Sequence, residues 1–403
     1  MNDKGQKRNK TAESSDRNVA AFLGKETPMR KTAYQMRELA ACALHGKVPS
    51  QELLAQVDPE KLYIMCQFHC LTAMVAVALR SAGIRSPQWE EEYVKAVRKS
   101  ILLAAERRKL CEFLEQNGIW YLPLKGIVLE SMYPEIGMRQ MADNDILYDK
   151  TARDKVRTFL TANGYQAISF GKSHHDVYQK PPVYHFEMHV SLYPAGREKR
   201  IEAYYANPER LLRKDADHRF GCHMTAEDFY LYMVAHTYKH ATGCGTGLRA
   251  LLDIYVYLQQ KSEVLDWAYL TAELRQLGLS EFEQQMRQLS LRVFSAVELP
   301  ALSADERKQL ESCLISGAYG TVQQGIQRQM QAYCAGETGG TKWHYLVQRV
   351  FPPRAVCQAR FPALKRYPFL LPVCWVIRLV QAVITQRKHL LLELRCFKEL
   401  RND

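Results

Sequence analysis

The sequence predicts an α+β protein in which a small mixed β-sheet is embedded between an N-terminal and a C-terminal helical region. Apolar residues recur at intervals of three and four over 30–118 and again over 197–340, which is typical of amphipathic helices. Between them, 119–196 carries short apolar or alternating runs bounded by Gly and Pro, which is typical of strands and tight connections. The 403-residue chain is 47% hydrophobic and 24% charged, which is ordinary for a globular protein.

The two ends of the chain are polar or basic. Residues 1–18 are polar and basic and contain no apolar segment, so we expect a disordered tail over 1–29 and no targeting signal. Residues 341–403 contain twelve Lys or Arg against three acidic residues, so most of the net charge of +12 lies there. This basic helical tail either packs on the body, as its apolar spacing favours, or binds nucleic acid. Its longest apolar run is broken by Pro368, Pro372 and Arg378, so we expect no transmembrane span.

The cysteines are scattered along the chain. Eleven cysteines occur without a CxxC pair, which favours reduced thiols in a cytoplasmic protein.

The middle segment follows the last N-terminal helix. Asn117-Gly118 ends that helix with a stop signal. The middle segment is then expected to hold, in chain order, a strand over 119–124, a helix over 127–133, a strand over 144–149, a helix over 155–165 and strands over 166–170 and 183–193.

Two aspartates stand at the start of the second expected strand, in the run Asp143-Asn144-Asp145. Residues two apart on a strand share one face, so both carboxylates point the same way. Crowded like charges are costly unless they are neutralised. A hard divalent cation with phosphate co-ligands would neutralise them, and a solvated strand end would make the cost small. The pair alone leaves both interpretations open.

Two further features accompany the aspartates. A strand–Lys125-Gly126–helix turn would let backbone N–H groups approach a phosphate, although most such turns are only turns. The run over 183–193 alternates, with Tyr184, Phe186 and Met188 on one face and His185, Glu187 and His189 on the other. Glu187 is therefore either a third carboxylate beside the aspartates or part of a solvated outer face.

The order of these features resembles the nucleotidyltransferase fold of the DNA polymerase beta type, and most closely a bacterial nucleotidyltransferase family. The resemblance covers roughly residues 35–380. It departs from the wider superfamily in two places: Ile127 follows Gly126 where Ser or Gly is usual, and Asn144 replaces an apolar residue, which should weaken packing. The matching residues are Leu124-Lys125-Gly126, Tyr133-Pro134, Gly137, Arg139, Asp143, Asp145, Leu147, Glu187-Met188-His189, His236, Lys239-His240, Leu248-Arg249 and Asp253.

The resemblance implies a nucleotidyltransferase core over 119–196 and an Mg²⁺-dependent enzyme, with Mn²⁺ as the alternative ion. Such an enzyme moves a nucleoside monophosphate from a nucleoside triphosphate such as ATP to a hydroxyl-bearing acceptor, with RNA and protein among the candidate acceptors. Asp143, Asp145 and Glu187 would be catalytic and would bind the metal, with Glu187 also a candidate general base. The nucleotide would be bound by Lys125, Gly126, Arg139, His189, His236, His240, Arg249 and Asp253.

Three other readings remain open. His236 and His240 lie one helical turn apart, as zinc ligands can, but Lys239 stands between them and the glutamate of HExxH is missing. The same pair is also consistent with core histidines. The third reading is a catalytically degenerate nucleotide- or RNA-binding protein, which the three clustered acids argue against. Further histidines occur nearby, at His174 and His175.

The crowding of the acids also predicts the effect of a substitution. Replacing Asp145 by Asn is expected to preserve or increase stability by relieving repulsion.

Overall fold

A computed structural model of the chain describes residues 27–196, 198–335, 342–358 and 361–385. The chain forms two compact units, the first comprising residues up to 239 together with 246–318, and the second comprising 240–245 together with the residues from 319 onward. Most of the expected N-terminal tail and the last part of the basic tail, 386–403, lie outside the described residues.

The N-terminal part of the first unit is helical, as predicted. Two of its helices begin with side-chain caps: the Ser50 side chain accepts from Leu53 N, and Asp58 precedes Pro59 and accepts from Lys61 N. The helix over 87–116 ends at Asn117-Gly118, where Gly118 has a φ of +68°. From residue 27 onward, the helices of this part are α2 (Thr27–His45), α3 (Gln51–Gln56), α4 (Pro59–His69), α5 (Thr72–Ser81) and α6 (Pro87–Gln116).

The middle of the first unit forms a five-stranded mixed sheet, which confirms the predicted fold class. Its order is β1-β2-β5-β4-β3, in which β2 and β5 are parallel and every other pair is antiparallel. The sequence analysis missed β4, because its residues mix polar and apolar types. The strands are β1 (Tyr121–Pro123), β2 (Asn144–Tyr148), β3 (Gln166–Ser169), β4 (His175–Lys180) and β5 (Tyr184–His189).

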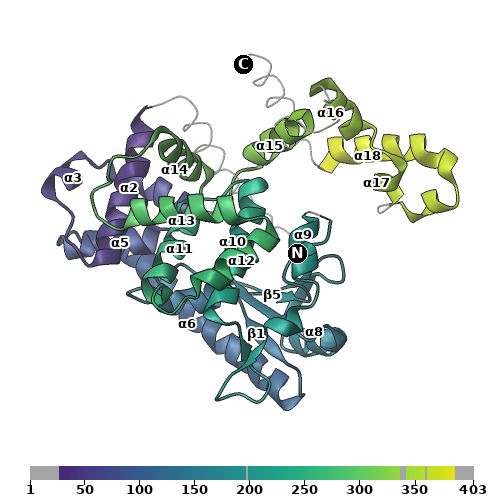
Figure 1. Ribbon diagram of the computed structural model, residues 1–403, viewed down its shortest axis with the longest axis horizontal. Coiled ribbons are helices and arrows are strands. Elements are labelled where there is room, and N and C mark those ends of the chain that lie inside the picture. The colour runs from purple at the N-terminus through teal and green to yellow at the C-terminus, as the bar shows by residue number, and fades with distance from the viewer. Residues whose placement is uncertain (1–26, 197, 336–341, 359–360, 386–403) are drawn as a thin grey trace. The chain divides into compact units, whose positions relative to one another are not determined.

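The sheet has one apolar face, which packs against α6 and α8 (Arg153–Ala162). Figure 1 shows α6 and α8 beside the strands. Ile146 and Phe186 on this face are buried together with Leu110 of α6 and Leu160 of α8. Asn144 points to the same side, where its Nδ2 donates to Leu103 O at 3.0 Å and its Oδ1 accepts from an Arg107 Nη at 2.9 Å. Asn144 therefore ties β2 to α6, and the expectation that it weakens packing is wrong.

Helices return after the sheet. In the first unit they are α9 (Lys199–Tyr204), α11 (Leu248–Lys261), α12 (Trp267–Leu277), α13 (Ser280–Phe294) and α14 (Ala304–Ser316), with a small sheet of β6 (Arg213–Lys214) and β7 (Cys222–His223). Helix α10 (Ala226–Thr242) extends from the first unit into the second. The second unit also contains α15 (Val322–Ala335), α16 (Lys342–Val350), α17 (Arg354–Gln358) and α18 (Leu371–Thr385).

The remaining helical elements are short. The expected helix over 127–133 is a single α-turn, α7 (Gly126–Leu129), continued by the 3₁₀ turn η1 (Glu130–Met132). The other 3₁₀ turns are η2 (Lys150–Ala152), η3 (Pro208–Leu211), η4 (Pro362–Lys365) and η5 (Pro368–Leu370). Within the described ranges, no helix combines the length and the apolar character that crossing a membrane requires.

Candidate active site

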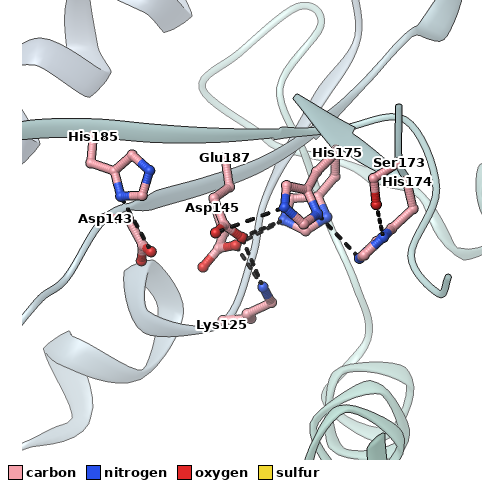
Figure 2. Close-up of polar contacts among 9 residues, drawn as sticks. Lys125, Asp143, Asp145, Ser173, His174, His175, His185 and Glu187 are labelled. Carbon is pink, nitrogen blue, oxygen red and sulfur yellow. Dashed lines mark hydrogen bonds and ion pairs between the residues drawn. The ribbon is translucent and has the colours of Figure 1, made fainter. Parts of the chain in front are cut away.

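The second face of the sheet is polar, and strand register determines which side chains share it. Asp145 of β2 lies opposite Glu187 of β5, and His189 of β5 lies opposite His175 of β4. Opposite residues on paired strands point to the same side of a sheet. The alternation over 184–189 therefore brings Glu187 and His189 to the same face as Asp145. Figure 2 shows the side chains of Glu187 and Asp145 close together.

Lys125 neutralises part of this acidic face. Its Nζ lies 2.6 Å from Asp145 Oδ1 and 3.8 Å from Glu187 Oε2. Burial alone would lower the pKa of the lysine, but the charges of Asp145 and Glu187, together with the hydrogen bond to Asp145, outweigh it and raise that pKa above its usual value. Lys125 is therefore a permanent cation in direct contact with the acids.

The backbone of Lys125 is strained. Its φ of +47° and ψ of −115° lie outside the regions that a residue with a side chain normally adopts. The strand end is held next to it, because Leu124 N donates to Asp145 O at 3.0 Å. A conformation of this kind costs about 1–3 kcal/mol and persists only where the surroundings enforce it. This turn places the ammonium group of Lys125 in contact with Asp145.

Asp145, Glu187 and His189 form one compact group of potential metal ligands on this face. One donor atom of each lies within 4.8 Å of the others. His189 Nε2 lies 2.8 Å from Asp145 Oδ1 and 3.6 Å from Glu187 Oε2. Burial opposes ionisation of Asp145, but Lys125 and His189 together hold its pKa well below the usual range. Both carboxylates are thus ionised at neutral pH, since the pKa of Glu187 is lowered too.

Asp143 lies near these acids but in a different environment. Its Oδ2 is 3.8 Å from His185 Nδ1 (Figure 2). Burial, followed by the charges of Asp145 and Glu187, raises the pKa of Asp143 to about 7. Among the described residues, the groups that could share one cation do not include Asp143. The predicted trio of acids is therefore brought to one region, with Asp143 apart from the compact group.

These donors suit Mg²⁺. The ion prefers oxygen ligands, and it is commonly held by one or two carboxylates together with substrate phosphates. Asp145 and Glu187 supply two such carboxylates on one face. Burial and the charges of Asp145 and Glu187 raise the pKa of Asp143 in spite of Lys125 and Lys99, so a further cation there would favour its ionised form.

Gly126 is required by a close contact with Arg139. A Cβ added at Gly126 would lie 2.5 Å from an Arg139 Nη atom and 3.2 Å from Met141 Sδ. The guanidinium cannot easily move away, because Arg139 Nε and its other Nη donate to the two oxygens of Asp253 at 2.8 and 2.9 Å. Tyr133 donates its hydroxyl to the same carboxylate at 2.8 Å. The residue is glycine because the arginine fills the space of a side chain.

Several predicted nucleotide ligands thus contact one another. Arg139 and Asp253 form a buried bidentate ion pair, and an Arg249 Nη donates to Gln140 O at 2.7 Å. These contacts join the segment before β2 to α11. They position Gly126 and the aspartates, while direct nucleotide contact by Arg139, Arg249 and Asp253 remains a prediction.

The histidines of α10 are divided between the two units. His236 belongs to the first unit, with its ring centroid 6.2 Å from that of Tyr232, and His240 belongs to the second. In the described part of the chain, the groups of three potential metal ligands contain neither residue. Their roles remain predictions.

The structure adds two features that the sequence analysis did not assign. His174 and His175 lie beside His189, and Lys125 is paired with Asp145. Val177 and Tyr178, which are residue types common in strands, were a weak signal for β4. The lysine pair carried no sequence signal, because it depends on a positive φ.

Comparison with known proteins gives one match. The model of a family described as "Uncharacterised nucleotidyltransferase" matches residues 55–295, which span α6, the sheet, α10 and α11. No curated protein and no solved structure matches the chain.

Proposed function

The chain belongs to this family of uncharacterised nucleotidyltransferases, and on that premise we propose that it is an Mg²⁺-dependent enzyme that transfers a nucleoside monophosphate from a nucleoside triphosphate to a hydroxyl-bearing acceptor. One observation carries the proposal. Asp145 and Glu187 are register partners on one sheet face, and the only strained lysine of the described chain reaches them from the strand–glycine turn.

The reaction exchanges one phosphorus–oxygen bond for another. The acceptor oxygen forms a bond to the α-phosphorus, the bond from the α-phosphorus to the bridging oxygen breaks, and pyrophosphate leaves. The hydroxyl proton passes to a carboxylate, for which Glu187 and Asp143 are the candidates. Mg²⁺, when bound, neutralises the triphosphate and the charge that develops on its oxygens.

The protein's own residues have two roles, binding the metal ion and binding the triphosphate. Asp145 and Glu187 are the metal ligands, and Asp143 adds its charge once a cation favours its ionised form. Before substrate binds, Lys125 neutralises Asp145. With a metal ion bound to Asp145 instead, the ammonium group of Lys125 would donate to triphosphate oxygens. Because α7 has only four residues, its dipole contributes little, and the phosphate contact depends on Lys125 and the backbone N–H groups of the turn.

The test is label transfer with two positions of the label. Purified protein and Mg²⁺ are incubated with a cell extract and each nucleoside triphosphate, labelled either at the α- or at the γ-phosphorus. Nucleotidyl transfer labels an acceptor from the α-position only and releases pyrophosphate. Labelling from the γ-position would indicate a phosphoryl transferase and contradict the proposal. Asp145→Asn should reduce the labelling on the order of a hundredfold or more, and His223→Asn, at an exposed residue of β7, should leave it unchanged.

A second candidate is a nucleotide-binding protein without catalysis. The 2.6 Å contact of Lys125 with Asp145 favours it, because a lysine that keeps this position would exclude a cation from the carboxylate. A thermal melt combined with the label-transfer assay distinguishes the two functions. Stabilisation by a triphosphate that is independent of Mg²⁺, without any transfer of label, would favour the second candidate.

A further inference from the structure

Three histidines meet beside the proposed catalytic face, and the proposed reaction uses neither His174 nor His175. One ring nitrogen of each of His174, His175 and His189 lies within 4.8 Å of one from each of the others. Nε2 of His174 and Nδ1 of His175 are 3.2 Å apart (Figure 2). A tetrahedral zinc ion with bonds of ~2.0–2.1 Å separates its ligand nitrogens by roughly 3.3 Å. The pair therefore has the spacing of two ligands of one ion.

His189 supplies the third nitrogen and the independent observation. The residue is 1% exposed, and its Nε2 lies 2.8 Å from Asp145 Oδ1. A carboxylate only accepts, so Nε2 carries the hydrogen, and in that tautomer of the imidazole Nδ1 has a lone pair. That Nδ1 is buried and has no hydrogen-bond partner. An unpaired buried polar atom costs about 1–3 kcal/mol, and a metal ion would provide its partner.

The remaining nitrogen of each ring faces an oxygen atom. His174 Nδ1 is 3.0 Å from Ser173 Oγ, His189 Nε2 contacts Asp145, and His175 Nε2 is 3.9 Å from Glu187 Oε1. Metal-binding histidines almost always donate their second N–H to such an oxygen, which orients the ring and fixes the tautomer. A plain hydrogen bond between His174 and His175 would explain their contact, but it would leave His189 Nδ1 unpaired.

We propose that His174, His175 and His189 form a second metal site, which binds a transition-metal ion of the Zn²⁺ class and is distinct from the carboxylates that suit Mg²⁺. Imidazole nitrogens select zinc and its neighbours in the first transition row, whereas Mg²⁺ requires oxygen. Three protein ligands leave one position of a tetrahedral ion for water or a phosphate oxygen. The site would thus place a second positive charge next to Asp145, through His189.

The test measures metal binding and does not depend on enzymatic activity. Untagged full-length protein, stripped with a chelator, is dialysed against Zn²⁺ and its metal content is measured. Co²⁺ is titrated separately, because tetrahedral cobalt absorbs strongly in the visible range. We expect one equivalent of Zn²⁺ per chain and a visible cobalt spectrum. His174→Asn should weaken binding about 100-fold or more, and Ser173→Ala, which alters the oxygen behind His174, about tenfold.

A matched control and a second variant keep the outcome clear. His223 of β7 is exposed and lies 2.7 Å from Asp215, so His223→Asn should bind metal as wild type does. If His174→Asn does not fold, His175→Asn and Ser173→Ala decide, with circular dichroism as the check on folding. Three results would overturn the proposal: wild type that binds no Zn²⁺, a His174→Asn protein that binds it unchanged, or Mg²⁺ in excess that displaces it.

Discussion

Two buried ionic clusters in the first unit differ in how their charges are balanced. Arg139 pairs with Asp253 through two hydrogen bonds, and Tyr133 donates a third. In the other cluster, Lys125 faces Asp145 and Glu187, with Asp143 nearby. The side chains of Arg139 and Lys125 are similarly buried, at 9% and 16% exposure, so burial does not distinguish the clusters.

What distinguishes them is stoichiometry. In the Arg139 cluster the charges of Arg139 and Arg249 act on one carboxylate, that of Asp253, so its charge is balanced and its role is to hold the segment before β2 against α11. In the Lys125 cluster the two lysines Lys125 and Lys99 counter three acids, and burial, followed by the charges of Asp145 and Glu187, raises the pKa of Asp143. A buried cluster with unbalanced charge has a reason to bind a ligand of the opposite charge. The following predictions test this difference, from the largest expected effect to the smallest.

Breaking the balanced cluster should have the largest effect on stability. Arg139→Met leaves Asp253 buried without its bidentate partner and with only the more distant charge of Arg249, which should cost about 3–5 kcal/mol of unfolding free energy. Urea unfolding measures this loss. Arg139→Met combined with Asp253→Leu should recover part of it, because no unpaired charge remains. Lys61→Met, at an exposed ion pair with Asp58, serves as the control and should hardly shift the midpoint. A small loss for Arg139→Met would show that the pair does not hold the fold.

Breaking the unbalanced cluster at Asp145 should affect both activity and stability. Asp145→Asn removes a metal-ligand charge, so label transfer should fall on the order of a hundredfold or more. From sequence alone the same change is expected to preserve or raise stability, but the structure reverses this, because Lys125 would lose its closest counter-charge. Thermal melting of the variant should therefore show a lower midpoint than wild type.

The double variant Lys125→Met/Asp145→Asn separates the two effects. It removes the unpaired ammonium group, so stability should return toward wild type while activity stays low. An Asp145→Asn protein with wild-type activity would remove Asp145 from the proposed site. An Asp145→Asn protein as stable as wild type would show that Lys125 finds another partner.

The sequence predicts the polar face of the sheet but not its internal pairing. The alternation over 184–189 correctly places Glu187 and His189 on one side, because a strand's period of two requires only local geometry. The pairing of Arg139 with Asp253 joins residues 114 positions apart, and no local pattern encodes it. Likewise, the contact of Lys125 with Asp145 depends on a strained turn whose φ is unfavourable for lysine. Backbone propensity favours a negative φ for lysine, so the contact of Lys125 with Asp145 could not be predicted from the sequence.

A smaller effect is expected at Gly126, where the two clusters meet. Gly126→Ala adds a methyl group 2.5 Å from an Arg139 Nη atom that Asp253 holds in place. The φ of Gly126 is compatible with alanine, so the cost is steric, about 1–3 kcal/mol. In an Arg139→Met background the same change should cost less, because the obstructing group is gone. Equal costs in the two backgrounds, measured by urea unfolding, would show that the arginine does not require the glycine.

The smallest effect is a pH dependence that reports the surplus of negative charge. Asp143 has a pKa of about 7 in the folded protein and about 3.9 when unfolded. Its contribution to stability is complete below the lower value and is lost as the pH rises through the higher one. Asp143→Asn has no carboxyl group to ionise there. Between about pH 6 and pH 8, wild type should lose about 1 kcal/mol relative to this variant in urea unfolding, and Mg²⁺ should reduce the loss. Asp58→Asn, at an exposed residue, should show no such trend. A constant difference between wild type and Asp143→Asn would mean that Asp143 is already ionised at pH 6. The Lys125 cluster would then be as well balanced as the Arg139 cluster, and it would have no electrostatic reason to bind a cation.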